Sequence, residues 1–205
     1  LTRNSVVGEA GSWNGSSRGG ALYVLNGAVQ VENCRILSNS ANCANIQGAF
    51  GGGVYFAGGQ NVLRSSLIAG NQTLPGNRGH SGGGIYLSAG SVVENCTVVE
   101  NSITEPSDRG GGLYRAGGQV TNTIVWSNTR AGTPDDVGGS VAAFWYSCAP
   151  ELTNSENFNL TGPPGFTTQG VWTLTRNAPC ANAGAYAPWM ADAQDLDGNP
   201  RVRAR

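Results

Sequence analysis

The sequence predicts an all-β fold, a single-stranded parallel β-helix (a solenoid) of about five coils with an irregular C-terminal cap. Three observations predict this fold. A unit of about thirty residues recurs four times in register, and each copy alternates apolar and polar residues. No window long enough for a helix has apolar residues at i, i+3 and i+4. The copies span residues 19–39, 51–71, 82–101 and 110–128.

Aligned copies place similar residues in columns. Each copy opens with Gly-Gly and a strand in which an aliphatic residue precedes tyrosine, and these tyrosines are Tyr23, Tyr55, Tyr86 and Tyr114. Two further apolar columns contain Val31, Leu63, Val93 and Val120, and then Ile36, Ile68, Val98 and Val125. Glycine and asparagine, which tolerate positive φ, separate these runs. We therefore expect three short strands and three corners in each coil.

A fixed asparagine closes each copy, and it has an equivalent one unit before the first copy. The column contains Asn4, Asn39, Asn71, Asn101 and Asn128. Because stacked coils repeat at the inter-strand spacing of about 4.8 Å, equivalent side chains lie above one another. An asparagine amide can then hydrogen-bond to the copy in the next coil. We expect a structural asparagine ladder.

The domain organisation follows from where this pattern stops. Residues 1–148 are expected to form the coils, and residues 149–205 a loop-rich cap of the same domain, because prolines accumulate there. Val141–Ser147 is expected to be a strand of the last coil, with Cys148 in the column of Cys34 and Thr123. A cap is needed because an open solenoid end exposes unpaired strands.

Three connectors precede successive Gly-Gly pairs and are expected to emerge at one corner of the solenoid. They comprise residues 40–50, 72–81 and 102–109. Insertions in a solenoid collect on one face, which is often the binding face. The outward side of the third strand, with Leu67, Val99 and Ile124, is more apolar than a solvated surface. We interpret it as covered by another segment of the parent protein or as a contact surface.

The unit GGGxY…VxNCxIxxN resembles the repeats of right-handed parallel β-helix proteins secreted by bacteria, including polymorphic-outer-membrane-protein-like surface proteins. The C-terminal part is similar as well, since Thr173–Gly184 (TLTRNAPCANAG) and Asp195–Val202 (DLDGNPRV) resemble the ending L…SPC…AG…DLDGNPR of many such proteins. The resemblance covers nearly all of the chain. It implies a right-handed coil and an extracellular or bacterial cell-surface location. It implies little about activity, because this scaffold carries lyases, hydrolases, adhesins and inert spacers alike.

Composition restricts the partners. Charged residues make up 12% of the chain and the formal net charge is −1, so the basic patch that a nucleic-acid binder needs is not expected. The sequence has no transmembrane run and no signal peptide. Its first residues, LTRN, match the closing ILSN of residues 36–39, so we expect a segment of a longer parent protein. A missing signal peptide is then no argument for a cytosolic location.

The five cysteines do not form a regular disulfide framework. Cys34 and Cys96 share an inward column, but they lie two coils apart, about 9.6 Å by the stacking distance. A disulfide needs a Cα separation below about 7 Å. Cys148 and Cys180, in the irregular C-terminal part, are the candidate disulfide pair. No Cys/His spacing indicates zinc.

The tyrosine column is the first candidate binding site. Its neighbours in the strand face inward, so Tyr23, Tyr55, Tyr86 and Tyr114 face outward and stack at about 4.8 Å. One interpretation is an aromatic platform for sugar rings. The other is that the rings stack on one another and are covered by the connectors.

A polar cluster at the connector corner is the candidate catalytic site. His80 lies two residues before one Gly-Gly pair and Asp108 two residues before the next, so in-register coils place their backbones about 5 Å apart. A His–Asp pair beside Arg109 suits general acid–base chemistry on a uronic acid, with the guanidinium holding the carboxylate. The alternative is that His80 and Asp108 form an ordinary solvent-exposed contact in a variable connector and have no catalytic role.

Other acidic residues favour structural roles. Asp135 and Asp136 are the only adjacent carboxylates, and they fall in a Thr-Pro-Asp-Asp turn rather than a glycosidase pair. Glu32, Arg64 and Glu94 alternate in one outward column, which indicates a surface charge ladder.

The DLDGN motif resembles the start of a calcium loop, with Asp195, Asp197 and Asn199 as ligands, but the glutamate at the twelfth position is missing. A terminal turn with Arg201 beside an aspartate is the other interpretation. No cofactor is expected apart from this calcium alternative.

We therefore expect a non-catalytic extracellular or cell-surface segment, an adhesin, stalk or surface-structure module that binds a polysaccharide or another cell-surface component through its tyrosine column. The alternative is a polysaccharide-acting enzyme, a lyase or glycoside hydrolase, with its groove along that column. Self-association through the unpaired first strand is a third hypothesis.

Overall fold

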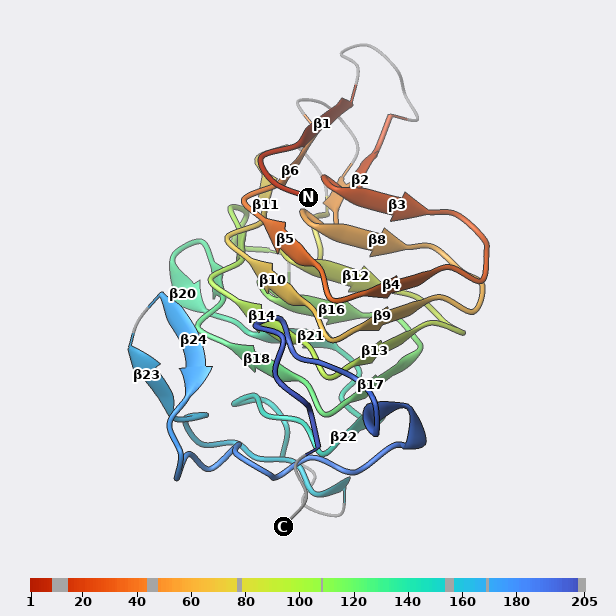
Figure 1. Cartoon of the computed structure of the whole chain (residues 1–205). Helices are drawn as coiled ribbons and strands as arrows, with labels where there is room; N and C mark the ends of the chain where they lie inside the picture. The colour runs from red at the N-terminus through yellow and green to blue at the C-terminus, as the bar shows by residue number, and fades with distance from the viewer. Residues whose placement is uncertain are drawn as a thin grey trace.

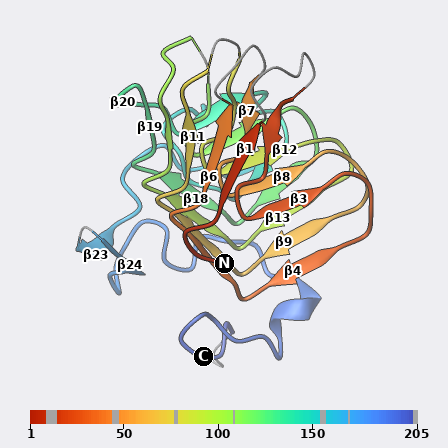
Figure 2. The same cartoon turned by 90° about the horizontal axis from the view of Figure 1, so that it is seen from above.

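A right-handed parallel β-solenoid of about four turns is the architecture of the chain, seen here in a computed structural model (Figure 1). The structure describes residues 1–8, 15–43, 48–76, 79–107, 109–153, 157–168 and 170–202. Viewed from above, the chain turns clockwise as it moves away from the viewer (Figure 2), which is the right-handed sense. The sequence predicted about five coils. The last one is incomplete, because it extends only some of the sheets.

Each full turn contains four short strands, where the sequence predicted three. The first sheet is formed by β3 (Leu22–Val24), β8 (Val54–Phe56), β12 (Ile85–Leu87), β16 (Leu113–Arg115) and β21 (Val137–Gly139). The second sheet is formed by β4 (Gln30–Glu32), β9 (Val62–Arg64), β13 (Val92–Glu94), β17 (Gln119–Thr121) and β22 (Phe144–Trp145). The third sheet is formed by β5 (Arg35–Leu37), β10 (Leu67–Ala69), β14 (Thr97–Val99) and β18 (Ile124–Trp126).

The fourth sheet was not predicted, because its strands open the segments that looked like connectors. It contains β1 (Ser5–Gly8), β6 (Ser40–Cys43), β11 (Gln72–Leu74), β15 (Ser102–Ile103) and β19 (Thr129–Arg130), with β20 (Thr133–Pro134) pairing antiparallel at its end. Ala41, Thr73 and Ile103 point inward and are buried. These strands are short and carry mixed side chains, so no apolar alternation marks them. The connectors are therefore shorter than predicted.

Two further short strands, β2 (Ser17–Arg18) and β7 (Ala49–Phe50), pair in parallel farther along these connectors. Single bridges continue their pairing from Phe50 to Ser81 and from Ser81 to Arg109. Ala41, Cys43 and Ala49 form a small second core at this corner. The connectors thus stack in register for part of their length.

The main core consists of the inward residues of the first three sheets. Aliphatic side chains from successive coils lie over one another in the columns that the repeat predicts, and the buried set includes Ile36, Leu63, Ile68, Ile85, Val93, Val98, Leu113, Val120 and Val125. Among the described residues, Phe56 and Phe144 are the largest side chains that are fully buried. Burial of this kind is the main favourable term in folding.

The Gly-Gly pairs are required by the geometry of the coil. The first glycine of each pair has φ between 61° and 76°, a left-handed conformation that glycine adopts without steric cost. At the second glycine, a Cβ would overlap backbone atoms of the neighbouring turn, as at Gly52 with Gly83. Coil corners elsewhere use Asn33, Ser65, Asn95 and Asn122, whose φ values lie between 50° and 53°.

Residues after Cys148 do more than cap the last coil. Ala149 donates its backbone N–H to Leu160 O at 3.0 Å, so the first part of this region covers the open end. A hairpin follows, formed by β23 (Phe166–Thr168) and β24 (Val171–Leu174). The chain then runs back beside the third sheet toward the first coil (Figure 1). We name residues 181–202 the C-terminal arm; it contains a short 3-10 helix, Pro188–Met190.

The arm contacts the fourth, the second and then the first coil. Asn122 hydrogen-bonds to Ala185, the Arg64 guanidinium lies 4.2 Å from the centre of the Trp189 ring, and Arg35 forms an ion pair with Asp197 at 3.1 Å. Leu67 and Ile124 on the outward side of the third strand face the hairpin and the arm across a shared cavity. The prediction that 149–205 only covers the last coil was therefore incomplete.

Candidate functional site

The asparagine ladder is continuous from Asn4 to Asn128. At every step the backbone N–H and the side-chain Nδ2 of one asparagine donate to Oδ1 of the next, at 2.8 to 2.9 Å. Each Nδ2 from Asn39 onward also donates to a backbone carbonyl of the preceding turn. All polar atoms of the buried amides are thereby used, as buried polar groups require.

The ladder ends on a carboxylate. Asn128 donates its backbone N–H and its Nδ2 to Oδ1 of Asp136 at 2.8 and 2.7 Å. Burial raises the pKa of Asp136 to about 6, against the lowering effect of the hydrogen bonds from Asn128. Asp135 Oδ2 accepts the backbone N–H of Gly110 at 3.0 Å and lies 3.4 Å from Arg130 Nε. Both adjacent carboxylates are therefore held in structural contacts.

The four tyrosines lie directly over one another in the first sheet, because Tyr23, Tyr55, Tyr86 and Tyr114 are successive pairing partners. Tyr55 and Tyr86 stack with ring centroids 4.6 Å apart and planes 16° from parallel. Tyr86 and Tyr114 stack at 5.4 Å and 22°. Tyr23 is tilted by 53° and is 43% exposed. In this tyrosine ladder the inner ring faces contact one another, and edges and hydroxyls are presented outward.

Connector residues cover the ladder in part. Phe50 makes edge contacts with Tyr55 and Tyr86 at centroid distances of 6.2 and 5.7 Å. The guanidinium of Arg18 lies 5.6 Å from the centre of the Tyr55 ring, a cation–π arrangement. Burial raises the pKa of Tyr55 and of Tyr86, so both phenols are protonated at neutral pH. The stacked rings and their partial cover by the connectors match the second interpretation, and binding of sugar rings to the column stays a prediction.

His80 lies inside the protein rather than on the connector surface. Its side chain is 1% exposed, and its Nδ1 accepts the backbone N–H of Ala49 at 3.2 Å. Arg109 continues the connector stack, pairing with Ser81. Asp108 lies outside the described residues, so the predicted His–Asp contact is not described either. A buried imidazole that accepts a backbone hydrogen bond is held as a packing group, away from a surface substrate.

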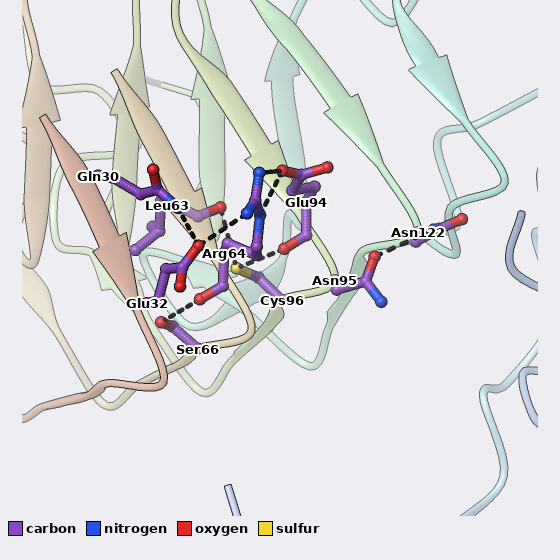
Figure 3. A network of polar contacts seen from close by, with 9 residues as sticks. All are labelled: Gln30, Glu32, Leu63, Arg64, Ser66, Glu94, Asn95, Cys96 and Asn122. Atoms are coloured by element: carbon purple, nitrogen blue, oxygen red, sulfur yellow. Dashed lines mark hydrogen bonds and ion pairs between the residues drawn. The ribbon is translucent and has the colours of Figure 1, made fainter. Parts of the chain in front are cut away.

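The charge column is a closed ion-pair network (Figure 3). Arg64 pairs with Glu32 at 2.7 Å and with Glu94 at 2.6 Å, and Trp189 of the arm lies on its guanidinium. Glu32 and Glu94 lie two coils apart, and Arg64 in the coil between them carries the opposite charge to both. The network therefore links three coils and the arm.

The DLDGN motif forms a turn that is stabilised by hydrogen bonds between its own residues. Oδ1 of Asp195 accepts the backbone N–H groups of Asp197 and Asn199 at 2.9 and 2.8 Å. These hydrogen bonds and the charge of Arg201 outweigh the opposing effect of burial and lower the pKa of Asp195. Within the described part of the chain, no cluster of three or more His, Cys, Asp or Glu side chains has the geometry to hold a metal ion.

Cys148 and Cys180 are brought together. Both are free thiols whose side chains lie within hydrogen-bond contact, and both line a cavity beneath the arm. The hydrogen bond with Cys180 and burial raise the pKa of Cys148. Cys148 does not occupy the column of Cys34, because it pairs with Ile124; Ser147 takes that column and accepts the backbone N–H of Thr123. The predicted column position was wrong by one residue.

No protein-family model matches the sequence, and neither the curated proteins nor the solved structures contain a significant match. Over the residues that the structure covers, no helix combines the length and apolar character of a membrane span. A functional proposal for this chain therefore rests on its own structure.

Proposed function

We propose that this chain is a non-catalytic module of an extracellular or cell-surface protein, and that it binds a polysaccharide along the tyrosine ladder. On this proposal it is part of a longer bacterial protein of the β-helix type that the repeat resembles. The solenoid acts as a rigid support, and the ladder supplies a row of equivalent contacts. A polymer with a repeating polar backbone is the partner that such a row suits best.

The observation that supports the proposal is the row of phenol hydroxyls. None of the four tyrosine hydroxyls has a hydrogen-bond partner among the described residues, and none is buried. They repeat at the coil spacing of about 4.8 Å. A hydroxyl can donate one hydrogen bond and accept others, which matches the hydroxyls of a sugar chain.

The stacking geometry decides how a glycan would bind. The inner ring faces are occupied by neighbouring rings, so sugar rings cannot stack between them. Contact along the ladder is therefore made by ring edges and hydroxyls, while the tilted ring of Tyr23 offers an exposed aromatic surface at one end. Arg18 beside Tyr55 adds a positive charge that favours an acidic polysaccharide.

The enzymatic alternative draws less support from the site. The imidazole of His80 is buried, and the carboxylates of Asp135 and Asp136 are engaged in structural hydrogen bonds. A lyase or hydrolase would need a base or a carboxylate pair that reaches the substrate. Incubation with a polysaccharide tests this alternative as well, because a lyase or hydrolase would release unsaturated products or reducing ends.

Affinity electrophoresis through gels that contain neutral or acidic polysaccharides tests the proposal. We expect a sulfated polysaccharide without uronate units to retard the protein, so that the result does not depend on carboxylate binding elsewhere on the chain. The variant with all four ladder tyrosines changed to phenylalanine keeps the ring stack and removes the hydroxyls, so it should migrate as in a plain gel. Thr167→Val, which removes an exposed hydroxyl on the hairpin strand β23, is the matched control and should be retarded like the unchanged protein.

Two results would contradict the proposal. One is equal retardation of the four-phenylalanine variant and the unchanged protein. The other is the release of reducing ends or unsaturated products during incubation, which would identify an enzyme. Circular dichroism melting of each variant separates loss of binding from loss of fold.

A further inference from the structure

A cavity of about 700 Å³ lies where the C-terminal arm passes the last coils, away from the tyrosine ladder. Its walls come from the corner residues Asn95 and Asn122, from Tyr146 and Cys148 of the last coil, and from Arg201 of the arm. Sites for small molecules usually have volumes of about 300–1,000 Å³. The cavity is thus large enough for a sugar unit or a molecule of similar size.

Arg201 gives this cavity its charge. It is the one charged side chain among the described lining residues. Its guanidinium is half-buried, its Nε is buried without a hydrogen-bond partner in the described part of the chain, and it forms no ion pair within 4.0 Å there. Burial lowers its pKa, and the nearby groups Cys96 and Asp195 oppose this lowering. A buried unpaired donor is unfavourable, so an anionic acceptor in the cavity would be bound favourably.

Neutral polar groups line the cavity together with this cation, and the charge of Asp195, outside the cavity lining, also acts on it. Asn122 uses its amide on the arm, at 2.8 Å to both the oxygen and the nitrogen of Ala185, and it donates to Oδ1 of Asn95 at 3.0 Å. The Nδ2 of Asn95 points away from Asn122 and has no partner among the described residues (Figure 3). Tyr146 is held against Phe158, with stacked rings 4.9 Å apart. Oriented amide and hydroxyl groups beside one cation suit a polyhydroxylated anion.

We propose that this cavity binds a small carboxylated sugar, a hexuronate unit, with its carboxylate on Arg201 and its hydroxyls on Asn95 and Tyr146. Arginine binds a carboxylate through two parallel hydrogen bonds. A single guanidinium balances one negative charge, which favours a carboxylate over a doubly charged phosphate. Ile124 and Leu160 supply an apolar wall for the carbon face of the ring. The site is separate from the tyrosine ladder, so the two proposals stand or fall independently.

Isothermal titration of the full chain with galacturonate and digalacturonate tests the proposal, with galactose, acetate and inorganic phosphate as comparisons. We expect the two uronates to bind and the comparison compounds to bind at least about tenfold more weakly. Arg201→Gln should weaken uronate binding about tenfold or more, because it removes a charge-assisted contact. Arg201→Lys keeps the charge without the bidentate geometry and should give an intermediate affinity.

Arg176→Gln is the control, because Arg176 is exposed and does not line the cavity. It should leave uronate binding unchanged, and thermal melting should show that all variants fold. Absence of uronate binding would overturn the proposal. So would equal binding of galactose, equal binding of acetate or phosphate, or full uronate affinity in Arg201→Gln. The four-phenylalanine ladder variant should bind uronate as the unchanged protein does, which separates this site from the ladder.

Discussion

Asn128 donates both its backbone N–H and its side-chain amide to the same carboxylate oxygen of Asp136, which lies only eight residues later in the chain. Every other ladder asparagine donates to an asparagine one full coil away. In each step the amide nitrogen points toward the C-terminal coil, so two unpaired donors would remain at the last step. The carboxylate takes both, and it therefore terminates the ladder.

Replacing this terminal acceptor should destabilise the protein. Asp136→Ala leaves two buried donors of Asn128 unsatisfied, and we expect a loss of about 2–5 kcal/mol in the free energy of unfolding. Asp136→Asn retains an acceptor oxygen and should cost under about 1.5 kcal/mol. Urea unfolding measures both values. A loss in Asp136→Ala no greater than in Asp136→Asn would show that the acceptor is dispensable.

The same carboxylate should make stability depend on pH. Burial raises its folded-state pKa from 3.8 to about 6, so between these values the folded protein binds more protons than the unfolded chain. The contribution of Asp136 to stability is therefore greatest below about pH 4, falls as the pH rises to about 6, and is constant above that. Asp136→Asn should remove this slope. The measurement is urea unfolding of both proteins at a series of pH values. If the free energy of unfolding changed with pH in the same way in both proteins, the pH dependence would not come from Asp136.

The interior of the ladder should be less tolerant of substitution than its exposed N-terminal end at Asn4. Asn71→Ala removes the acceptor of two hydrogen bonds from Asn39 and the donors to Asn101 and to the Ile36 carbonyl, all in buried positions. We expect a loss of about 2–4 kcal/mol. Asn4→Ala is the matched control, because Asn4 is exposed and its side-chain amide only donates; its cost should be within about 0.5 kcal/mol. If chemical denaturation gave the same loss of unfolding free energy for Asn71→Ala and Asn4→Ala, burial of the amide would not be the cause of the loss.

The sequence could predict those contacts that recur with the repeat. Each column of the coil depends on one kind of residue at one spacing, so the tyrosine and asparagine registers follow directly from alignment. The role of Asp136 could not be read in this way, because it follows Asn128 by eight residues where the preceding ladder step spans 27. A turn brings it back under the column, and no periodicity marks that turn.

The path of the arm was beyond prediction for a similar reason. Its contacts are single long-range pairs, such as Arg35 with Asp197, separated by 162 residues. No pattern in either segment specifies the other. The cavity beneath the arm, with Arg201 as its cation, depends on that path and was therefore not predicted. The fourth sheet was missed because strands of two to four residues with mixed side chains have too little alternation to be recognised.

Oxidation should join Cys148 to Cys180, since the two thiols are in contact beneath the arm. With oxidised glutathione as the oxidant, the two protein thiols become one disulfide and the glutathione disulfide is reduced to two thiols. Because the bond closes a loop of 32 residues (180 minus 148), it should stabilise the folded state by about 2–4 kcal/mol. Mass spectrometry of tryptic fragments should identify the 148–180 link, and thermal melting should show the gain. Cys180→Ser removes the link and should abolish the gain, whereas Cys34→Ser, in the first coil and four coils from Cys148, should leave it intact. Oxidised protein that carries glutathione on Cys180 and no internal bond would contradict the prediction.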